Sequence, residues 1–192
     1  MSLILSMLDA NQSLGPGSTP TFAGVKTNLN VGTVATGSSV VEYGDGFTHT
    51  SVITVNTTLG AIAGGANLGL GKLIYTFPAG TVIIDEAYIS MAITQTQGNI
   101  NADTPDVGLG TTVASGAVPL LSGTAAFENV LTGHTAANCT GTATVATTSS
   151  NTEIAPANDH TLYFNVADGW AASGDAAALL TGTIVIDWNF MN

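Results

Sequence analysis

The alternation of apolar and polar residues is strongest in residues 72–94, which read KLIYTFPAGTVIIDEAYISMAIT. On both sides of a central Pro78-Ala79-Gly80, bulky apolar side chains occupy every second position, the period of a half-buried β-strand. Pro78 and Gly80 interrupt the pattern, because proline cannot donate a ladder hydrogen bond and glycine readily adopts turn conformations. The stretch therefore predicts two neighbouring core strands of an all-β domain, joined by a turn.

Short alternating runs recur along the rest of the chain, with turn-forming residues such as Gly44-Asp45-Gly46 between them. The other predicted strands are Val40–Tyr43, Ser51–Asn56, Val107–Thr111, Val118–Leu121, Ala125–Leu131, Thr140–Ala146, Leu162–Val166 and Ile184–Phe190. About eight to ten strands at roughly 10-residue spacing are typical of two packed sheets. The fold class that we expect is all-β: a two-sheet antiparallel β-sandwich with a jelly-roll-like body.

Three stretches depart from this pattern. Residues 59–71 (LGAIAGGANLGLG) are interpreted as a glycine-rich loop, which lacks the lysine and the strand-to-helix context of a phosphate-binding loop. Residues 171–180 are interpreted as a short turn of helix. Asp85 and Glu86 would face opposite sides of a strand among apolar neighbours, so we expect a bend there that keeps both carboxylates in water.

The start of the chain is interpreted as an extended arm, residues 1–35, ahead of a β-sandwich domain, residues 36–192. Pro16 and Pro20 bias their predecessors to extended geometry. A disordered terminus without a role is the alternative, but Leu14, Phe22 and the first residues, MSLILSML, are too apolar for a solvated tail. We expect Leu14, Pro16, Pro20 and Phe22 to bind a partner.

Charge is scarce and almost entirely negative. Only 8% of the residues are charged, against roughly 25% in ordinary domains, which suits a chain that spends its life within an assembly. Two lysines, no arginine and 13 acidic residues give a formal net charge of −11. Because phosphate recognition needs cationic side chains, we expect no nucleic-acid partner and no attraction to a membrane surface. A threonine- and glycine-rich secreted sandwich is the alternative to an assembly subunit.

Targeting signals are not recognisable in the sequence. The residues MSLILSML lack a basic n-region and are too short for a signal peptide, and no segment reaches the roughly 18 apolar residues of a membrane span. We therefore expect synthesis in the cytoplasm without export. The glycosylation sequons at Asn11, Asn56 and Asn138 are then chance matches.

The cysteine and the histidines indicate no metal chemistry. Cys139 is the single cysteine, so it forms no intrachain disulfide, and alternation would place it with Ala143 and Val145 on one buried face. The three histidines, His49, His134 and His160, are far apart and lack the spacing of metal ligands. We expect them to be solvated surface residues.

Acidic and aromatic residues leave a few weak candidates for a site. Asp103 and Asp106 could contribute to a calcium site, although the sequence has no calcium-loop pattern. A glycosidase pair of acids from distant strands stays open, but a sugar-processing cleft normally has more aromatic residues than the 6% present. Trp188 alternates with core residues, whereas Trp170 lies in a loop and could stack on a ligand or anchor a contact. No catalytic triad or nucleophile motif is recognisable, so we expect neither an enzyme nor a cofactor.

Several short stretches together resemble a known family. The segment Ser18–Val25 contains PTFAG and resembles linkers of tailed-phage virion proteins that lead into β structure. Tyr75–Gly80, Asp106–Thr111 and Gly182–Phe190 resemble the capsid decoration, or cement, proteins of tailed bacteriophages. The resemblance covers roughly residues 18–190, and its motifs are structural rather than catalytic.

This resemblance implies a virion protein on the capsid exterior. Such proteins have a β-sandwich or jelly-roll body, often form homotrimers, and clamp neighbouring subunits of the major capsid protein. The implied partners are therefore the major capsid protein and further copies of this chain, contacted through Leu14, Pro16, Pro20, Phe22 and Trp170. A head-fibre or tail subunit, or a carbohydrate-binding host-adhesion module, is the alternative.

Overall fold

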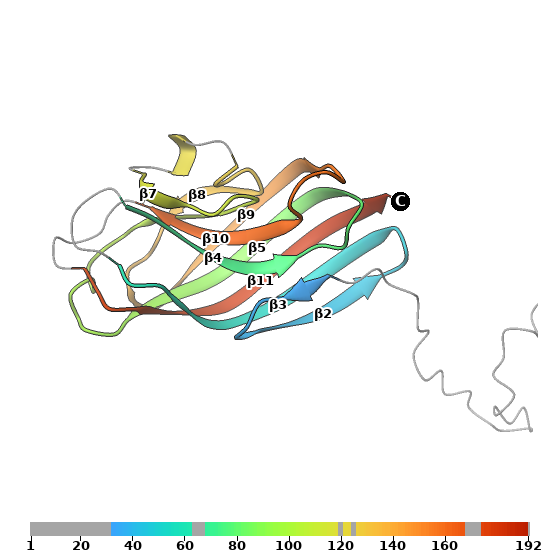
Figure 1. The fold of residues 1–192 in the computed structure, drawn as a ribbon. Coiled ribbons are helices and arrows are strands. Elements are labelled where there is room, and N and C mark those ends of the chain that lie inside the picture. Colours follow the sequence, from blue (N-terminus) through green and yellow to red (C-terminus); the bar gives the residue numbers. More distant parts are fainter. Residues whose placement is uncertain (1–31, 63–67, 119–120, 124–125, 168–173, 192) are drawn as a thin grey trace, which may run out of the picture.

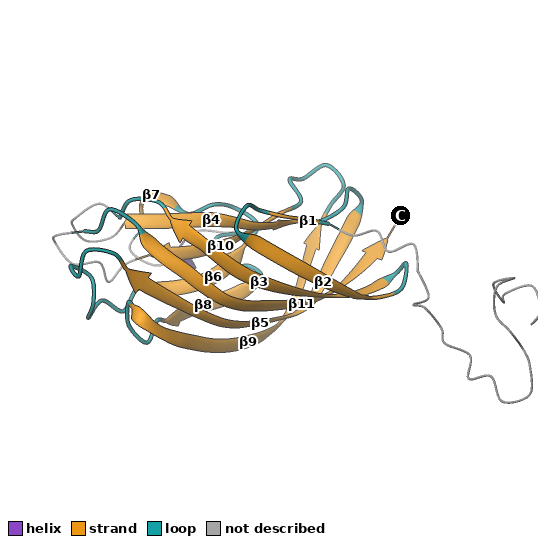
Figure 2. Cartoon of the chain, turned by 90° about the horizontal axis from the view of Figure 1, so that it is seen from below, coloured by secondary structure: helices purple, strands orange, loops and turns teal. Residues whose placement is uncertain are grey.

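The computed structural model describes residues 32–62, 68–118, 121–123, 126–167 and 174–191 of the chain. Two antiparallel sheets contain most of the described residues, and loops gather at the two ends of the molecule (Figures 1 and 2). The all-β, two-sheet antiparallel sandwich predicted from alternation is therefore confirmed.

The two sheets differ in the lengths of their strands. Sheet A orders β1 (Thr33–Val34), β4 (Leu68–Thr76), β10 (Thr161–Ala167), β6 (Asp106–Gly110) and β8 (Leu131–Thr135), with β7 (Ser115–Ala117) also paired to β4. Sheet B orders β2 (Ser38–Gly44), β3 (Thr48–Leu59), β11 (Ala178–Met191), β5 (Thr81–Gln95) and β9 (Thr140–Ile154). A single turn of 3₁₀ helix, η2 (Leu121–Gly123), accompanies the strands within the described ranges.

The strand order is that of a jelly roll. From β3 to β6, and again from β8 to β11, successive strands alternate between the sheets, so that β3 and β5 flank β11 in sheet B, while β4 and β6 flank β10 in sheet A. β2 extends sheet B beyond β3 as an edge strand. The stretch 72–94 accordingly contributes β4 to one sheet and β5 to the other, so its two strands lie in opposite sheets and do not pair.

The core lies between the sheets. Ile184, Ile186, Trp188 and Phe190 of β11 alternate inward and are at most 5% exposed, as their spacing predicts. The predicted bend at Asp85 is also confirmed, because the register of β5 shifts there against both neighbouring strands. Asp85 and Glu86 both remain exposed to solvent.

Several predicted elements are wrong within the described residues. Val118 lies outside any strand and Leu121 begins η2, while residues 126–130 form turns and bends before β8 begins. Residues 68–71, predicted as loop, belong to β4. Residues 174–180 form no helix: Asp175 makes an isolated bridge with Ile62, and β11 begins at Ala178. Apolar alternation in short runs does not distinguish a strand from a segment that packs over a sheet.

Cys139 is buried as expected, but the predicted face is wrong, because Ala143 and Val145 are exposed. Two pairings of β9 with β5 explain the change of face: Thr140 pairs with Thr94, and Ala143 pairs with Ala92. Between these pairs β9 has one residue more than β5, and Gly141 accommodates this bulge with φ of 95°. The bulge reverses the inward and outward positions that follow it.

The outer face of sheet A is covered by its own chain. Apart from β7, which pairs with β4, the described part of residues 111–130 lies over β4, β6 and β10. It buries a small second cluster that consists of Ala114, Val118, Leu121, Phe127 and Ala167. Glycines permit the approach, since a Cβ at Gly110 would lie 2.3 Å from the Ala126 carbonyl oxygen. The fully buried Asn165 amide accepts from Ala114 N at 2.8 Å and donates to the carbonyls of Thr112 and Phe127, each at 2.8 Å.

Candidate functional site

The residues predicted to bind a partner lie outside the described residues. Leu14, Pro16, Pro20 and Phe22 belong to residues 1–31, and Trp170 belongs to residues 168–173. Their role as a contact surface stays a prediction. The structure instead defines the point at which the N-terminal segment joins the body, a small polar pocket, and the outer face of sheet B.

The N-terminal segment joins the body through a chain of hydrogen bonds. Gly32 N donates to the Tyr75 hydroxyl at 2.8 Å, and that hydroxyl donates to one oxygen of Glu42. Ser51 Oγ donates to the other oxygen of Glu42 at 2.8 Å and accepts from Trp188 Nε1 at 2.8 Å. Burial and the Glu42 carboxylate raise the pKa of Tyr75 well above its ordinary value. The chain of bonds connects Gly32 to strands of both sheets.

β1 strengthens this connection. Thr33 and Val34 pair with Thr76 and Tyr75 of β4, so the last residues of the predicted arm, 1–35, are part of sheet A. A truncation that removed them would also remove a sheet strand. The boundary that preserves the described body lies before Gly32.

His49 lies beside this network and was not expected there. Its imidazole is fully buried and stacks on Trp188, with 4.0 Å between the ring centroids and 12° between the planes. Neither ring nitrogen has a hydrogen-bond partner among the described residues. Burial lowers the pKa of His49, against the opposing effect of Glu42 and Asp45. The prediction of a solvated histidine is therefore wrong here, because the inward phase of β3 carries the residue into the core.

The other two histidines lie nearer the surface. His134 is exposed, and His160 is partly exposed with Nε2 placed 2.6 Å from the Gly80 carbonyl oxygen. Among the residues that the structure describes, no group of three or more histidine, cysteine, aspartate or glutamate side chains could hold a metal ion. Asp106 instead accepts a hydrogen bond from Leu121 N at 3.2 Å.

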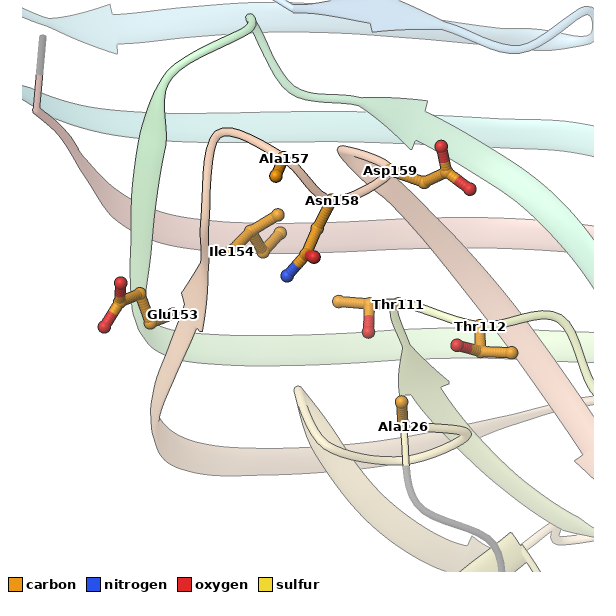
Figure 3. Close-up of a pocket in the computed structure, with 8 residues that line it drawn as sticks. All are labelled: Thr111, Thr112, Ala126, Glu153, Ile154, Ala157, Asn158 and Asp159. Atoms are coloured by element: carbon orange, nitrogen blue, oxygen red, sulfur yellow. The ribbon is translucent and has the colours of Figure 1, made fainter.

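A polar pocket of about 460 Å³ opens between the β9–β10 connection and the segment over sheet A (Figure 3). Its lining residues are Thr111, Thr112, Ala126, Glu153, Ile154, Ala157, Asn158 and Asp159. Asn158 points into the hollow, whereas the carboxylates of Glu153 and Asp159 point away from its centre (Figure 3). None of these described lining residues is aromatic, so they offer no stacking surface for a sugar ring.

The outer face of sheet B presents apolar side chains to solvent. Register places Val41, Val52, Val185 and Tyr88 in one row across β2, β3, β11 and β5. We call these four residues the apolar row; Val41 is 54% exposed. Sequence alternation assigns these residues to one side of their strands, but only the strand order brings them together.

The row on one side of the apolar row contains two carboxylates beside Tyr43, Thr50 and Ser149, and the row on the other side contains no charged group. The row on the side of the register shift at Asp85 contains the carboxylates Asp187 and Glu86. Asp187 accepts a hydrogen bond from Thr50 Oγ1 at 2.5 Å, and Glu86 accepts one from Thr147 Oγ1 at 3.2 Å. The row on the opposite side consists of small or hydroxyl side chains and one valine: Ser39, Thr54, Thr183, Ser90 and Val145. This face can make apolar and hydrogen-bonded contacts.

Comparisons of the chain with family models, with curated proteins and with solved structures found no match. No helix in the described part of the chain is long and apolar enough to span a membrane.

Proposed function

We propose that the chain is a structural virion protein that binds the outer surface of a tailed-phage head and cements neighbouring subunits of the major capsid protein. In this proposal the N-terminal segment contacts the capsid through Leu14, Pro16, Pro20 and Phe22, with Trp170 as a further contact. The β-sandwich associates with further copies of the chain. The protein has no enzymatic activity and needs no cofactor.

The observation that carries this proposal is the firm attachment of the N-terminal segment at Gly32. A clamp must transmit force from its binding segment to its body. The hydrogen bonds from Gly32 pass through Tyr75 and Glu42 to Ser51 and Trp188. A force on the N-terminal segment is therefore distributed over strands of both sheets. The Trp188–Ser51 bond is buried and the other three are partly buried, and bonds in such a network are costly to break one at a time.

The charge of the chain agrees with an exterior location. A net charge of −11 with two basic residues offers nothing to a packaged genome. The same charge favours a partner surface that is neutral or basic. Numerous weak contacts of this kind gain avidity from the repeated copies on a shell.

The test uses heads that lack this chain, prepared from the virus that encodes it, in a co-sedimentation assay. The full-length protein should bind, and the combined substitutions Leu14→Ser and Phe22→Ser should weaken binding about 10- to 100-fold, the usual effect of losing two apolar contacts. A matched control carries Asn11→Ser and Gln12→Ser and should bind like the wild type.

Removal of residues 1–31 provides the second arm of this test, since it leaves Gly32 and its bonds to the body in place. Full binding by a folded, truncated protein would exclude the N-terminal segment as the capsid contact. Absence of binding by the full-length protein would contradict the capsid function itself.

A carbohydrate-binding adhesion module is the second candidate, and the polar pocket is the observation in its favour. Thr111, Thr112 and Asn158 offer hydrogen-bond groups of the kind that hold sugar hydroxyls. Glycan binding that Asn158→Ala abolishes, without an effect on capsid binding, would support the module. Because none of the described lining residues is aromatic, we regard the capsid function as the better supported of the two.

A further inference from the structure

The outer face of sheet B has three consecutive rows of different chemistry. The apolar row, with Val185 near its centre, lies between the carboxylate row of Asp187 and Glu86 and the hydroxyl row of Thr183 and Ser90. No lysine or arginine side chain belongs to these rows. The order of the rows along the strands is therefore acidic, apolar, hydroxyl.

We infer that this face binds a second copy of the chain, with the two B sheets packed face to face about a two-fold axis that runs along the apolar row. Such an interface is isologous, so each copy contributes the same surface. The inference does not rest on the proposed capsid function.

The order of the rows favours a second copy of the chain as the partner, and it favours a two-fold axis along the apolar row. Rotation about the apolar row reverses the direction of the strands, so the carboxylate row of one copy faces the hydroxyl row of the other. Asp187 and Glu86 then lie opposite Thr183 and Ser90 of the second copy, where hydroxyl groups can donate to the carboxylates. An axis along the strands would instead place carboxylates against carboxylates, which is unfavourable.

The size of the face is sufficient for a stable pair. Five strands at about 4.8 Å spacing give a width of about 24 Å, and five two-residue steps along β11 give a length of about 34 Å. The product is about 800 Å² for each copy, the size of a standard specific interface. Aligned packing of two sheets at about −30° is also a common geometry for sandwich cores.

Charge opposes the association at long range. Each copy has a net charge of −11, so two copies repel each other before contact. Because added salt screens this repulsion but leaves the apolar contact in place, we expect the pair to become tighter as the salt concentration rises. An interface built on attraction between opposite charges would show the reverse dependence.

The first experiment measures the mass of the full-length protein in solution by light scattering across a wide concentration range, at low and high salt. The wild type should reach twice the monomer mass, and Val185→Glu should raise the dissociation constant about 100-fold or more, because it places charges at the centre of the interface. Val113→Glu is the matched control: Val113 lies on the sheet A side and is 38% exposed, so this variant should associate like the wild type.

The second experiment tests the geometry. Val185→Cys places two thiols opposite each other across sheets about 10 Å apart, too far for a disulfide but within reach of a short bis-maleimide. The native Cys139 is fully buried and should not react. Val185→Cys should cross-link to a pair, whereas Val113→Cys should not. A monomer at every concentration, a trimer, or a pair that Val185→Glu leaves intact would overturn the inference.

Discussion

The outer faces of the two sheets are built in opposite ways. On sheet A, Gly69, Gly71, Gly108 and Gly110 alternate with core residues along β4 and β6, and the segment over the sheet comes within contact of each. On sheet B, valine, threonine and tyrosine occupy the outward positions, and Val145 is 62% exposed. The chain closes one face itself and presents side chains to solvent on the other.

The covered face of sheet A contributes mainly to folding stability, whereas the outer face of sheet B is available for contacts between molecules. Glycine in a strand costs about 0.5–1 kcal/mol relative to alanine, and on sheet A the buried cluster and the bonds of Asn165 offset that cost. The β-branched residues of sheet B favour strands without requiring a cover. Substitutions on the covered face should therefore lower the free energy of unfolding, and substitutions on the open face should change contacts between molecules.

Asn165→Ala should have the largest effect. It leaves Ala114 N and the carbonyls of Thr112 and Phe127 without their partner in a buried site. We expect the free energy of unfolding to fall by about 3–5 kcal/mol, measured by urea denaturation. Asn189→Ala on sheet B is the control, because Asn189 makes a single exposed bond to Asp85. Similar losses for both variants would refute the contrast between the faces.

Much of the fold could be predicted from the sequence. Alternation from Ile184 to Phe190 and from Leu162 to Val166 assigns the inward residues correctly, because burial of one face imposes a period of two. The pairing of strands is not encoded in local periodicity, so the apolar row could not be assembled from sequence. The order of the strands arises only when both sheets close over one core.

The covered face was missed for a different reason. Residues 111–130 contain enough apolar residues to suggest strands, and the role of Asn165 depends on contacts far away in the sequence. One local signal was available: glycine at alternate positions in Leu68–Gly71 and Gly108–Gly110 marks a face where another segment approaches closely. His49 is in phase with the inward Ile53 and Val55, but the strand predicted from sequence began only at Ser51, so the histidine was not assigned to the inward face.

His49, on the inner face of sheet B, should make the free energy of unfolding depend on pH. Because burial lowers the pKa of His49 in the folded protein, the unfolded chain binds the proton more readily. Stability should be constant above about pH 6.5, the ordinary histidine pKa, and should fall below it by at most about 1.4 kcal/mol per pH unit. Glu42 and Asp45 reduce this loss, since both favour the protonated ring.

Urea denaturation between pH 8 and pH 5 measures this dependence. His49→Phe retains a ring against Trp188 and should remove much of the loss, whereas the exposed His134→Gln should leave it unchanged. A wild-type stability that does not change over this range would show that the buried imidazole either stays neutral or finds a partner on protonation.

The smallest effect should come from the open face. Val41→Thr combined with Val145→Thr preserves the β-branched shape at two positions that are 54% and 62% exposed. In dilute protein the free energy of unfolding should change by less than about 0.5 kcal/mol. If residues of the same molecule cover this face, the free energy of unfolding should fall by more than this, at every protein concentration.

If a second copy covers the face, the free energy of unfolding should fall only at protein concentrations at which the wild type associates. Thermal denaturation at low and high protein concentration therefore distinguishes a face that is open in the monomer from one that the chain closes itself.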